Sequence, residues 1–142
     1  MTRHFLVGIV LLAATAFAAS AQESGLVALE TRQDSQGWEA VGRLDIQGKG
    51  FCTASLIRDR LILTAAHCLY DDDGSLITAD RFEFRAGLRD GRASATRNIT
   101  RAIAHPDYVH NGEATRPSEV AKDIAVLELD RPIRAVRMRP YL

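Results

Sequence analysis

The sequence of 142 residues predicts an all-β protein of at most one domain. Short runs of apolar and β-branched residues recur from residue 38 onward, and clusters of Gly, Asp and Pro separate them. The sequence contains no long amphipathic helical stretch, internal repeat or low-complexity tract. Hydrophobic residues make up 46% of the chain and charged residues 25%, which are ordinary fractions for a globular protein. Short strands at this spacing are typical of a sandwich or a barrel.

The first three predicted strands follow one another closely. They cover residues 38–46, 51–57 and 60–65. Gly48-Lys49-Gly50 supplies the turn between the first two, and Arg58-Asp59 supplies the next turn. We expect Trp38, at the start of the first strand, to be a core anchor.

Three further strands are predicted at 82–87, 95–104 and 123–129. The second of these alternates Thr, Ile and Arg, and Pro132 ends the last one. Two long polar connections, 70–81 and 105–122, lie between strands. The first contains three consecutive aspartates, and the second contains two prolines and a glycine.

The N-terminus has the pattern of a secretory signal peptide over residues 1–21. Arg3 gives a short positive region, residues 5–19 form an apolar run, and Ala19-Ser20-Ala21 matches the cleavage pattern. The apolar run of 15 residues is shorter than the ~20 that a membrane span needs, although an uncleaved anchor is the alternative. We expect a secreted or periplasmic protein with no membrane contact after cleavage. Residues 22–37 then form an extended lead-in or pro-segment.

Charge and ligand patterns point to neither nucleic acid nor a cofactor. The 18 basic residues balance 18 acidic ones, so no electrostatic excess favours nucleic acid. The spacing of Asp71-Asp72-Asp73-Gly74 does not match a calcium loop, and a solvated acidic turn is the better interpretation. His105 and His110 have no third ligand placed to complete a zinc site. We therefore expect neither a metal nor a cofactor.

Two cysteines bracket a predicted hairpin and a histidine. Cys52 and Cys68 lie 16 positions apart in an exported chain, where one disulfide would stabilise the fold by about 3 kcal/mol. The bridge would also fix the strand end that carries His67, and a rigidly held histidine suits a general base. The alternative is a plain structural disulfide beside an ordinary loop histidine.

A carboxylate opens the last predicted strand. Asp123 precedes the apolar run 124–127, and a carboxylate at the mouth of a core is costly unless it is paired. An imidazole N–H is a natural partner, because the carboxylate would orient the ring and stabilise its cation. The alternative is an aspartate that caps a turn.

Together these segments resemble the trypsin/chymotrypsin-like serine proteases, peptidase family S1. T-A-A-H-C stands at 64–68, D-I-A-V-L at 123–127, and C-T-A-S-L-I at 52–57 matches the family's C-x-G-S-L-I. W-E-A-V-G at 38–42 is similar to the family's opening strand. The resemblance covers about 37–132, and the two main motifs occur in the family's order.

The resemblance implies a role for each motif. His67 would be the general base and then the general acid, and Asp123 would orient it, with Cys52 and Cys68 disulfide-bonded. The family is built from two six-stranded Greek-key barrels. Residues 38–142 would be the N-terminal barrel, which supplies histidine and aspartate and belongs to an incomplete protease domain.

The nucleophilic serine of the family lies in G-D-S-G-G in the second barrel, and this motif is absent here. The available serines outside the signal peptide stand in other contexts; they are Ser24, Ser35, Ser55, Ser75, Ser94 and Ser118. We therefore expect a secreted endopeptidase acting on protein or peptide substrates, present as an N-terminal fragment that is inactive without its C-terminal barrel.

The sequence is also compatible with two kinds of protein that are not proteases. The chain could be a non-catalytic, protease-like binding protein, although such a protein has no need of both His67 and Asp123. It could also be a small exported β-barrel that acts as a binding module.

Overall fold

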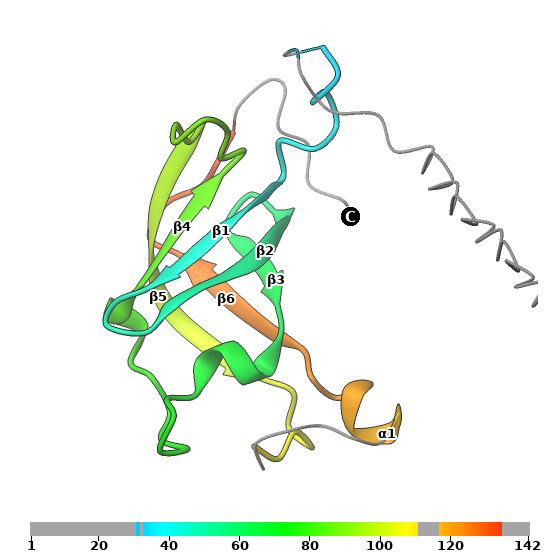
Figure 1. The fold of residues 1–142 in the computed structure, drawn as a ribbon, viewed down its shortest axis with the longest axis vertical. Helices are drawn as coiled ribbons and strands as arrows, with labels where there is room; N and C mark the ends of the chain where they lie inside the picture. The colour runs from blue at the N-terminus through cyan, green and yellow to red at the C-terminus, as the bar shows by residue number, and fades with distance from the viewer. Residues whose placement is uncertain (1–30, 32, 111–116, 135–142) are drawn as a thin grey trace, which may run out of the picture.

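The structure is a computed structural model that describes residue 31 and residues 33–110 and 117–134 (Figure 1). The predicted signal peptide, and most of the predicted lead-in, lie outside these residues. Within them, no helix is long and apolar enough to cross a membrane.

Six antiparallel strands close into one barrel, which confirms the all-β prediction. The strands are β1 (Val41–Ile46), β2 (Gly50–Arg58), β3 (Leu61–Thr64), β4 (Phe82–Ala86), β5 (Ala95–Ala104) and β6 (Ala125–Leu129). Their order around the barrel is β1-β2-β3-β6-β5-β4, so β3 pairs with β6 rather than with β4. This jump between strands distant in the sequence gives the barrel a Greek-key order.

The barrel interior is filled by side chains that alternate along each strand. In β4 the buried positions are Phe82, Phe84 and Ala86, with Glu83 exposed between them. The same period of two places every second residue of β1 and β6 inside the barrel. The interior is therefore a packed core rather than a channel.

The chain before β1 differs from the prediction. Trp38 is 58% exposed and lies in a turn, so the expectation of a core anchor is wrong. Gly37, with φ +93°, reverses the chain just before Trp38, and Ala40 takes the buried position instead. The described end of the lead-in also forms turns rather than extended chain, because Thr31 and Asp34 hydrogen-bond to each other.

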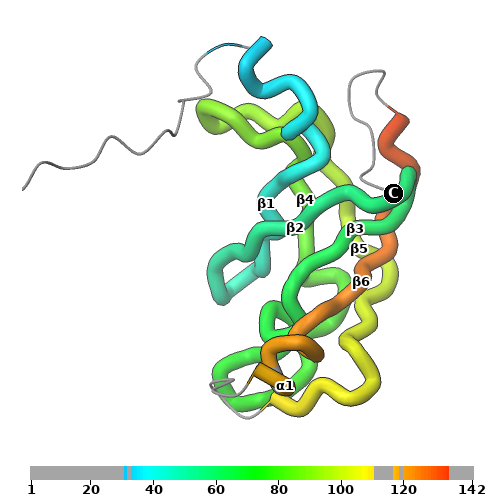
Figure 2. Tube along the Cα trace, turned by 90° about the vertical axis from the view of Figure 1, so that its right-hand side faces the viewer, coloured from blue at the N-terminus to red at the C-terminus, as the bar shows by residue number. Residues whose placement is uncertain are grey.

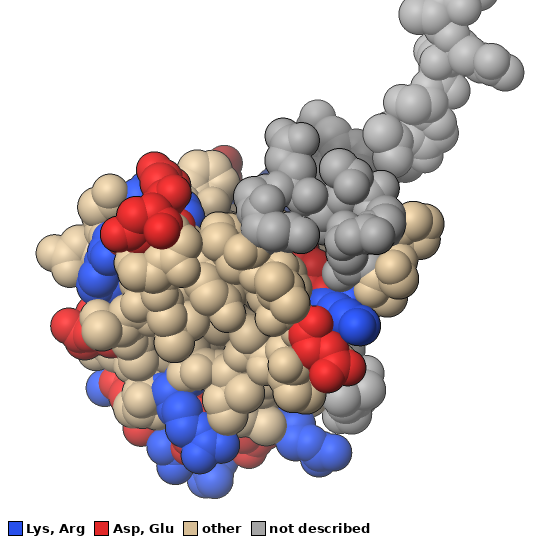
Figure 3. Space-filling view, turned by 90° about the horizontal axis from the view of Figure 1, so that it is seen from below, with Lys and Arg blue, Asp and Glu red and all other residues tan. Residues whose placement is uncertain are grey.

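The described parts of both long connections lie at one end of the barrel, together with short helical turns (Figure 2). These turns are the 3-10 helices η1 (Ala66–Leu69) and η2 (Ala79–Arg81) and the single-turn α1 (Pro117–Val120). Seen from this end, charged side chains lie mostly at the rim, and uncharged residues form the centre (Figure 3).

The acidic turn in the first connection is held by basic side chains. Arg81 Nη1 donates to Asp71 Oδ2 at 2.7 Å and Lys49 Nζ lies 3.5 Å from Asp72 Oδ1. Arg81 also donates to the backbone carbonyl of Gln47, which ties this turn to the β1–β2 hairpin. Asp73 in turn accepts a hydrogen bond from the backbone N–H of Ser75 at 2.9 Å, so each of the three aspartates has a structural partner.

Gly42 is the position where the β1–β4 contact tolerates no side chain. A Cβ added there would meet the carbonyl oxygen of Arg85 and lie 2.8 Å from the Cα of Ala86, both on β4. We expect Gly42→Ala to lower the free energy of unfolding by about 1–3 kcal/mol, because backbone atoms must shift to admit the methyl group. Urea unfolding followed by circular dichroism measures this loss. The exposed Thr96→Ala is the control, and equal stability of the two variants would contradict the prediction.

Candidate active site

His67 projects outward from a turn whose other residues anchor it in the core. β3 ends at Thr64, Ala65 is extended, and the 3-10 turn η1 begins at Ala66. The other three members of this turn are buried, whereas the His67 side chain is 57% exposed. The turn is therefore fixed by its neighbours, and the imidazole is left at the surface.

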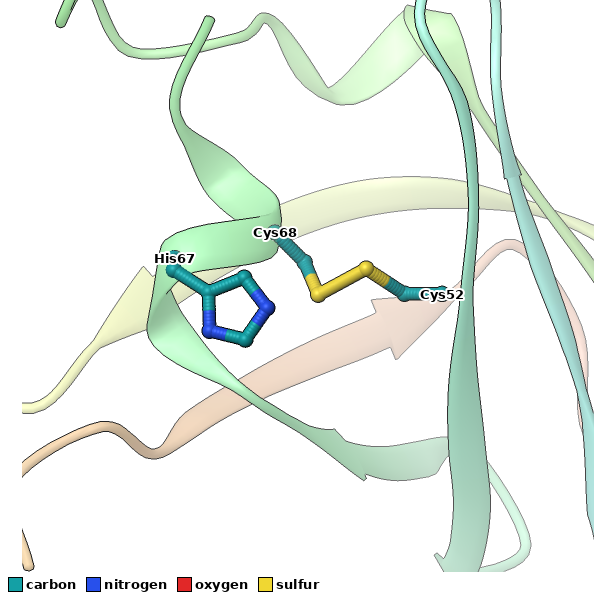
Figure 4. A group of neighbouring side chains, drawn as sticks. All are labelled: Cys52, His67 and Cys68. Carbon is teal, nitrogen blue, oxygen red and sulfur yellow. A yellow bond between two sulfur atoms is a disulfide. The ribbon is translucent and has the colours of Figure 1, made fainter. Parts of the chain in front are cut away.

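A disulfide joins this turn to β2. Cys68 is bonded to Cys52, with their Cα atoms 6.4 Å apart (Figure 4). The hydroxyl of Thr64 adds a second link, because it donates to the backbone carbonyl of Thr53 at 2.8 Å. The segment on either side of His67 is thus fastened to the same neighbouring strand.

Strand pairing brings Asp123 to His67 across 56 positions of sequence. Thr64, the last residue of β3, pairs with Ala125, the first residue of β6. Because the strands are antiparallel, the chain leaving β3 and the chain entering β6 lie at the same end of the barrel. His67 follows the first of these ends closely, and Asp123 precedes the second.

Both oxygens of the Asp123 carboxylate accept hydrogen bonds from His67. Imidazole Nδ1 lies 2.7 Å from Oδ2, and the backbone N–H of His67 donates to Oδ1 at 2.8 Å. This double contact fixes both the position of the residue and the plane of its ring. With Nδ1–H as donor, the remaining ring nitrogen, Nε2, carries a free lone pair.

The environment keeps Asp123 ionised. Burial of the carboxylate acts to raise its pKa, but the hydrogen bonds from the His67 side chain and backbone outweigh this, and the pKa of Asp123 is lowered overall. A carboxylate whose pKa is lowered suits a group that orients an imidazole and stabilises its cation.

This lowered pKa makes the pairing sensitive to acid. Ionised Asp123 contributes stability above its unfolded pKa of about 3.9, and this contribution is lost as the pH falls through the lower folded value. We expect the ¹³C shift of the Asp123 carboxyl to titrate with a midpoint below 3.9. His67→Ala removes one of the two hydrogen bonds and should raise this midpoint. A wild-type midpoint above that of the variant would contradict the assignment.

An aromatic cluster flanks the pair and joins the two long connections. The rings of Tyr70 and His110 are stacked, with centroids 4.7 Å apart and planes 3° from parallel. The hydroxyl of Tyr108 lies 3.3 Å from His110 Nδ1. Burial, and then the negative charge of Asp123, raise the pKa of the Tyr108 hydroxyl. Tyr70 directly follows η1, so this cluster supports the turn that holds His67.

Sequence reasoning did not assign this cluster. Residues 105–108 form a His-Pro-Asp-Tyr run, which the protease family commonly carries before its aspartate strand, and that signal marks Tyr108. Nothing in the sequence marks Tyr70 and His110 as partners, because their contact depends on how two loops fold.

A histidine that a carboxylate orients at the rim of an antiparallel barrel is chemically suited to act as a general base. Residues 29–141 match the family described as Trypsin, and the chain therefore belongs to the trypsin family of serine proteases. This confirms the resemblance on which the sequence-based predictions depend.

Similar proteins include three proteases of animals. The chain is 32% identical to serine protease filzig of Drosophila melanogaster over 102 residues, covering 68% of this chain and 6% of that protein. It is 31% identical to coagulation factor IX of Oryctolagus cuniculus over 85 residues, covering 60% of this chain and 28% of the relative. Cathepsin G of Mus musculus is 34% identical over 88 residues, which cover 62% of this chain and 29% of the relative. The matched segments thus span less than a third of each relative.

A solved structure has a similar fold. The structure of Glu endopeptidase in complex with MPD aligns with a TM-score of 0.54 at 24% identity. The alignment covers 67% of this chain and 41% of that one. The predicted trypsin-like barrel is therefore confirmed.

Proposed function

We propose that this chain supplies the histidine and aspartate of the active site of a secreted serine endopeptidase. The observation that carries the proposal is the double contact between His67 and Asp123, at 2.7 and 2.8 Å, in a member of the trypsin family. His67 is the general base and then the general acid, and Asp123 holds its tautomer. The substrates are proteins or peptides.

The proposed reaction follows from the protonation of the imidazole. Nδ1–H donates to Asp123, so Nε2 is free to take the proton of a serine hydroxyl as that oxygen attacks the peptide carbonyl. The resulting imidazolium is stabilised by the adjacent carboxylate. Nε2–H then donates its proton to the leaving amine. The serine and the oxyanion hole come, in this proposal, from a second barrel outside the 142 residues.

An apolar patch on the barrel supports a second barrel as the partner. Leu63 on β3 and Ile103 on β5 both pair with Val126 of β6, and both have exposed side chains. Ile124, just before β6, is exposed as well. Neighbouring exposed apolar side chains mark an interaction surface. In this proposal residues 38–142 are one barrel of the protease domain, residues 22–37 a lead-in or pro-segment, and residues 1–21 a cleaved signal peptide that directs the protein to the periplasm or outside the cell.

A fluorophosphonate probe tests this function, because it reacts with an activated serine nucleophile. We expect the protein that contains both barrels to be labelled and the 142-residue chain alone to remain unlabelled. His67→Ala should lower the labelling rate of the two-barrel protein by several orders of magnitude, whereas His105→Ala should not. A two-barrel protein that folds but resists the probe would instead be a non-catalytic binding protein.

A further inference from the structure

His110 lies where the two long connections meet, close to the candidate active site. Its imidazole is stacked on the ring of Tyr70, with centroids 4.7 Å apart. Gly74 is also near this ring, because a Cβ built there would lie 3.8 Å from His110 Cδ2, an ordinary van der Waals distance. Tyr70 and Gly74 belong to the first connection and His110 belongs to the second. The imidazole of His110 therefore joins the two connections.

The stacked pair is linked to His67 through the first connection. Tyr70 directly follows η1, and its backbone N–H donates to the carbonyl of His67 at 3.3 Å. Leu69, which precedes Tyr70, is fully buried, and its carbonyl accepts a hydrogen bond from the N–H of Ile77 at 2.8 Å. The Tyr70 ring is therefore held close to the turn that presents the imidazole of His67.

The same stacked pair is linked to Asp123 through the second connection. The hydroxyl of Tyr108 lies 3.3 Å from His110 Nδ1, and the negative charge of Asp123 contributes to the raised pKa of this hydroxyl. The backbone adds a second link, because the N–H of His105 donates to the carbonyl of Ile124 at 2.8 Å. The segment that carries Tyr108 and His110 is thus fastened to the chain beside Asp123.

We propose that His110 is a positioning residue, which clamps the two connections together and thereby keeps His67 in contact with Asp123. The pairing of β3 with β6 fixes where the two chain ends leave the barrel. The clamp fixes how the loops beyond these ends lie against each other. Tyr70 and Tyr108 both pack against the hydrophobic core, so the clamp has a fixed support on either side.

The clamp would act on the rate of the chemical step, a consequence that rests on the proposed function. Displacement of a reacting group by about 1 Å can lower a rate by roughly 100-fold. Loss of the Tyr70–His110 stack would free the η1 turn to move relative to Asp123, and the imidazole would then spend less time in its aligned position. We therefore expect His110 to influence kcat more than KM.

Hydrogen exchange of one backbone amide tests the clamp in the 142-residue chain without any measurement of proteolysis. The N–H of His67 donates to Asp123 Oδ1 at 2.8 Å, so its exchange rate reports how often the pair separates. We expect His110→Ala to speed this exchange about 3- to 10-fold, the range expected for the loss of one aromatic stack. Gly42→Ala, which destabilises the barrel at the β1–β4 contact, is the matched control and should not change it. Equal acceleration by both variants would overturn the proposal, because His110 would then only stabilise the barrel.

The kinetics of the two-barrel protein provide a second test, with rescue by a conservative variant. His110→Ala should lower kcat about tenfold and leave KM nearly unchanged. His110→Phe keeps a ring that can stack on Tyr70 and should recover most of this loss. A raised KM with unchanged kcat would instead identify His110 as a substrate contact and contradict the positioning role. If the two-barrel protein resists the fluorophosphonate probe, the proposed function fails, whereas amide exchange of His67 still decides whether the clamp exists.

Discussion

Replacing Asp123 with asparagine in the two-barrel enzyme is expected to lower kcat about 10⁴-fold, the magnitude known for the equivalent substitution in this protease family rather than one derived from this structure. The physical reason is the tautomer of His67. The carboxylate oxygen lies 2.7 Å from Nδ1 and accepts its proton, whereas an amide NH₂ at the same place donates. The ring proton then resides on Nε2, and the nitrogen that should act as base has no free lone pair.

Hydrolysis of a peptide amide substrate, measured at saturation, checks this prediction. KM should change far less than kcat, because the substitution alters proton transfer and not the substrate-binding surface. Asp107→Asn, at an exposed aspartate in the connection before β6, provides the control and should retain full activity. A loss of less than tenfold in kcat for Asp123→Asn would show that another group orients the base.

Removing the Cys52–Cys68 disulfide should lower the free energy of unfolding by more than Gly42→Ala does. The bridge closes a loop of 16 positions, and the chain-entropy model assigns it about 3 kcal/mol through restriction of the unfolded chain. We expect Cys52→Ala with Cys68→Ala to lower the free energy of unfolding by about this amount. Alanine is the appropriate replacement at position 68, because the site is buried and a hydroxyl there would need a partner.

Denaturant unfolding of the oxidised wild type and the double variant measures this loss. Each single variant should lose as much as the double variant, because either substitution breaks the same bond. Wild type in the presence of a phosphine, which opens the bridge, should approach the double variant. A double variant within 0.5 kcal/mol of wild type, roughly the range of an ordinary surface substitution, would mean that the hydrogen bonds around η1 suffice to hold the turn.

The strands were predictable because their burial alternates with a period of two. The predicted strand at 95–104 coincides with β5, and the other strands differ by one to three residues at their ends. The largest difference lies before β1, where Gly37 reverses the chain and leaves Trp38 exposed. A single tryptophan beside an apolar run predicts a buried side chain. The backbone conformation of Gly37, which places Trp38 at the surface instead, cannot be read from that pattern.

The two members of the candidate site were predictable for a different reason. His67 and Asp123 stand in short motifs whose family roles are specific, so the sequence named them without any knowledge of distance. Their environment was not predictable in this way. The stacking of Tyr70 on His110 depends on two connections that meet in space, and neither the spacing nor the composition of those connections encodes the contact.

In the proposed two-barrel protease, the pairing of Thr64 with Ala125 has a consequence for assembly. Because one barrel contains both strand ends, the imidazole and its carboxylate are aligned when that barrel folds, before any second barrel arrives. A shift of one residue in the β3–β6 register would turn the side chains of one strand to the other face of the sheet. His67 and Asp123 would then no longer meet. In the proposed protease, the base and its carboxylate would therefore be aligned within one barrel, and docking of the second barrel would add the nucleophile.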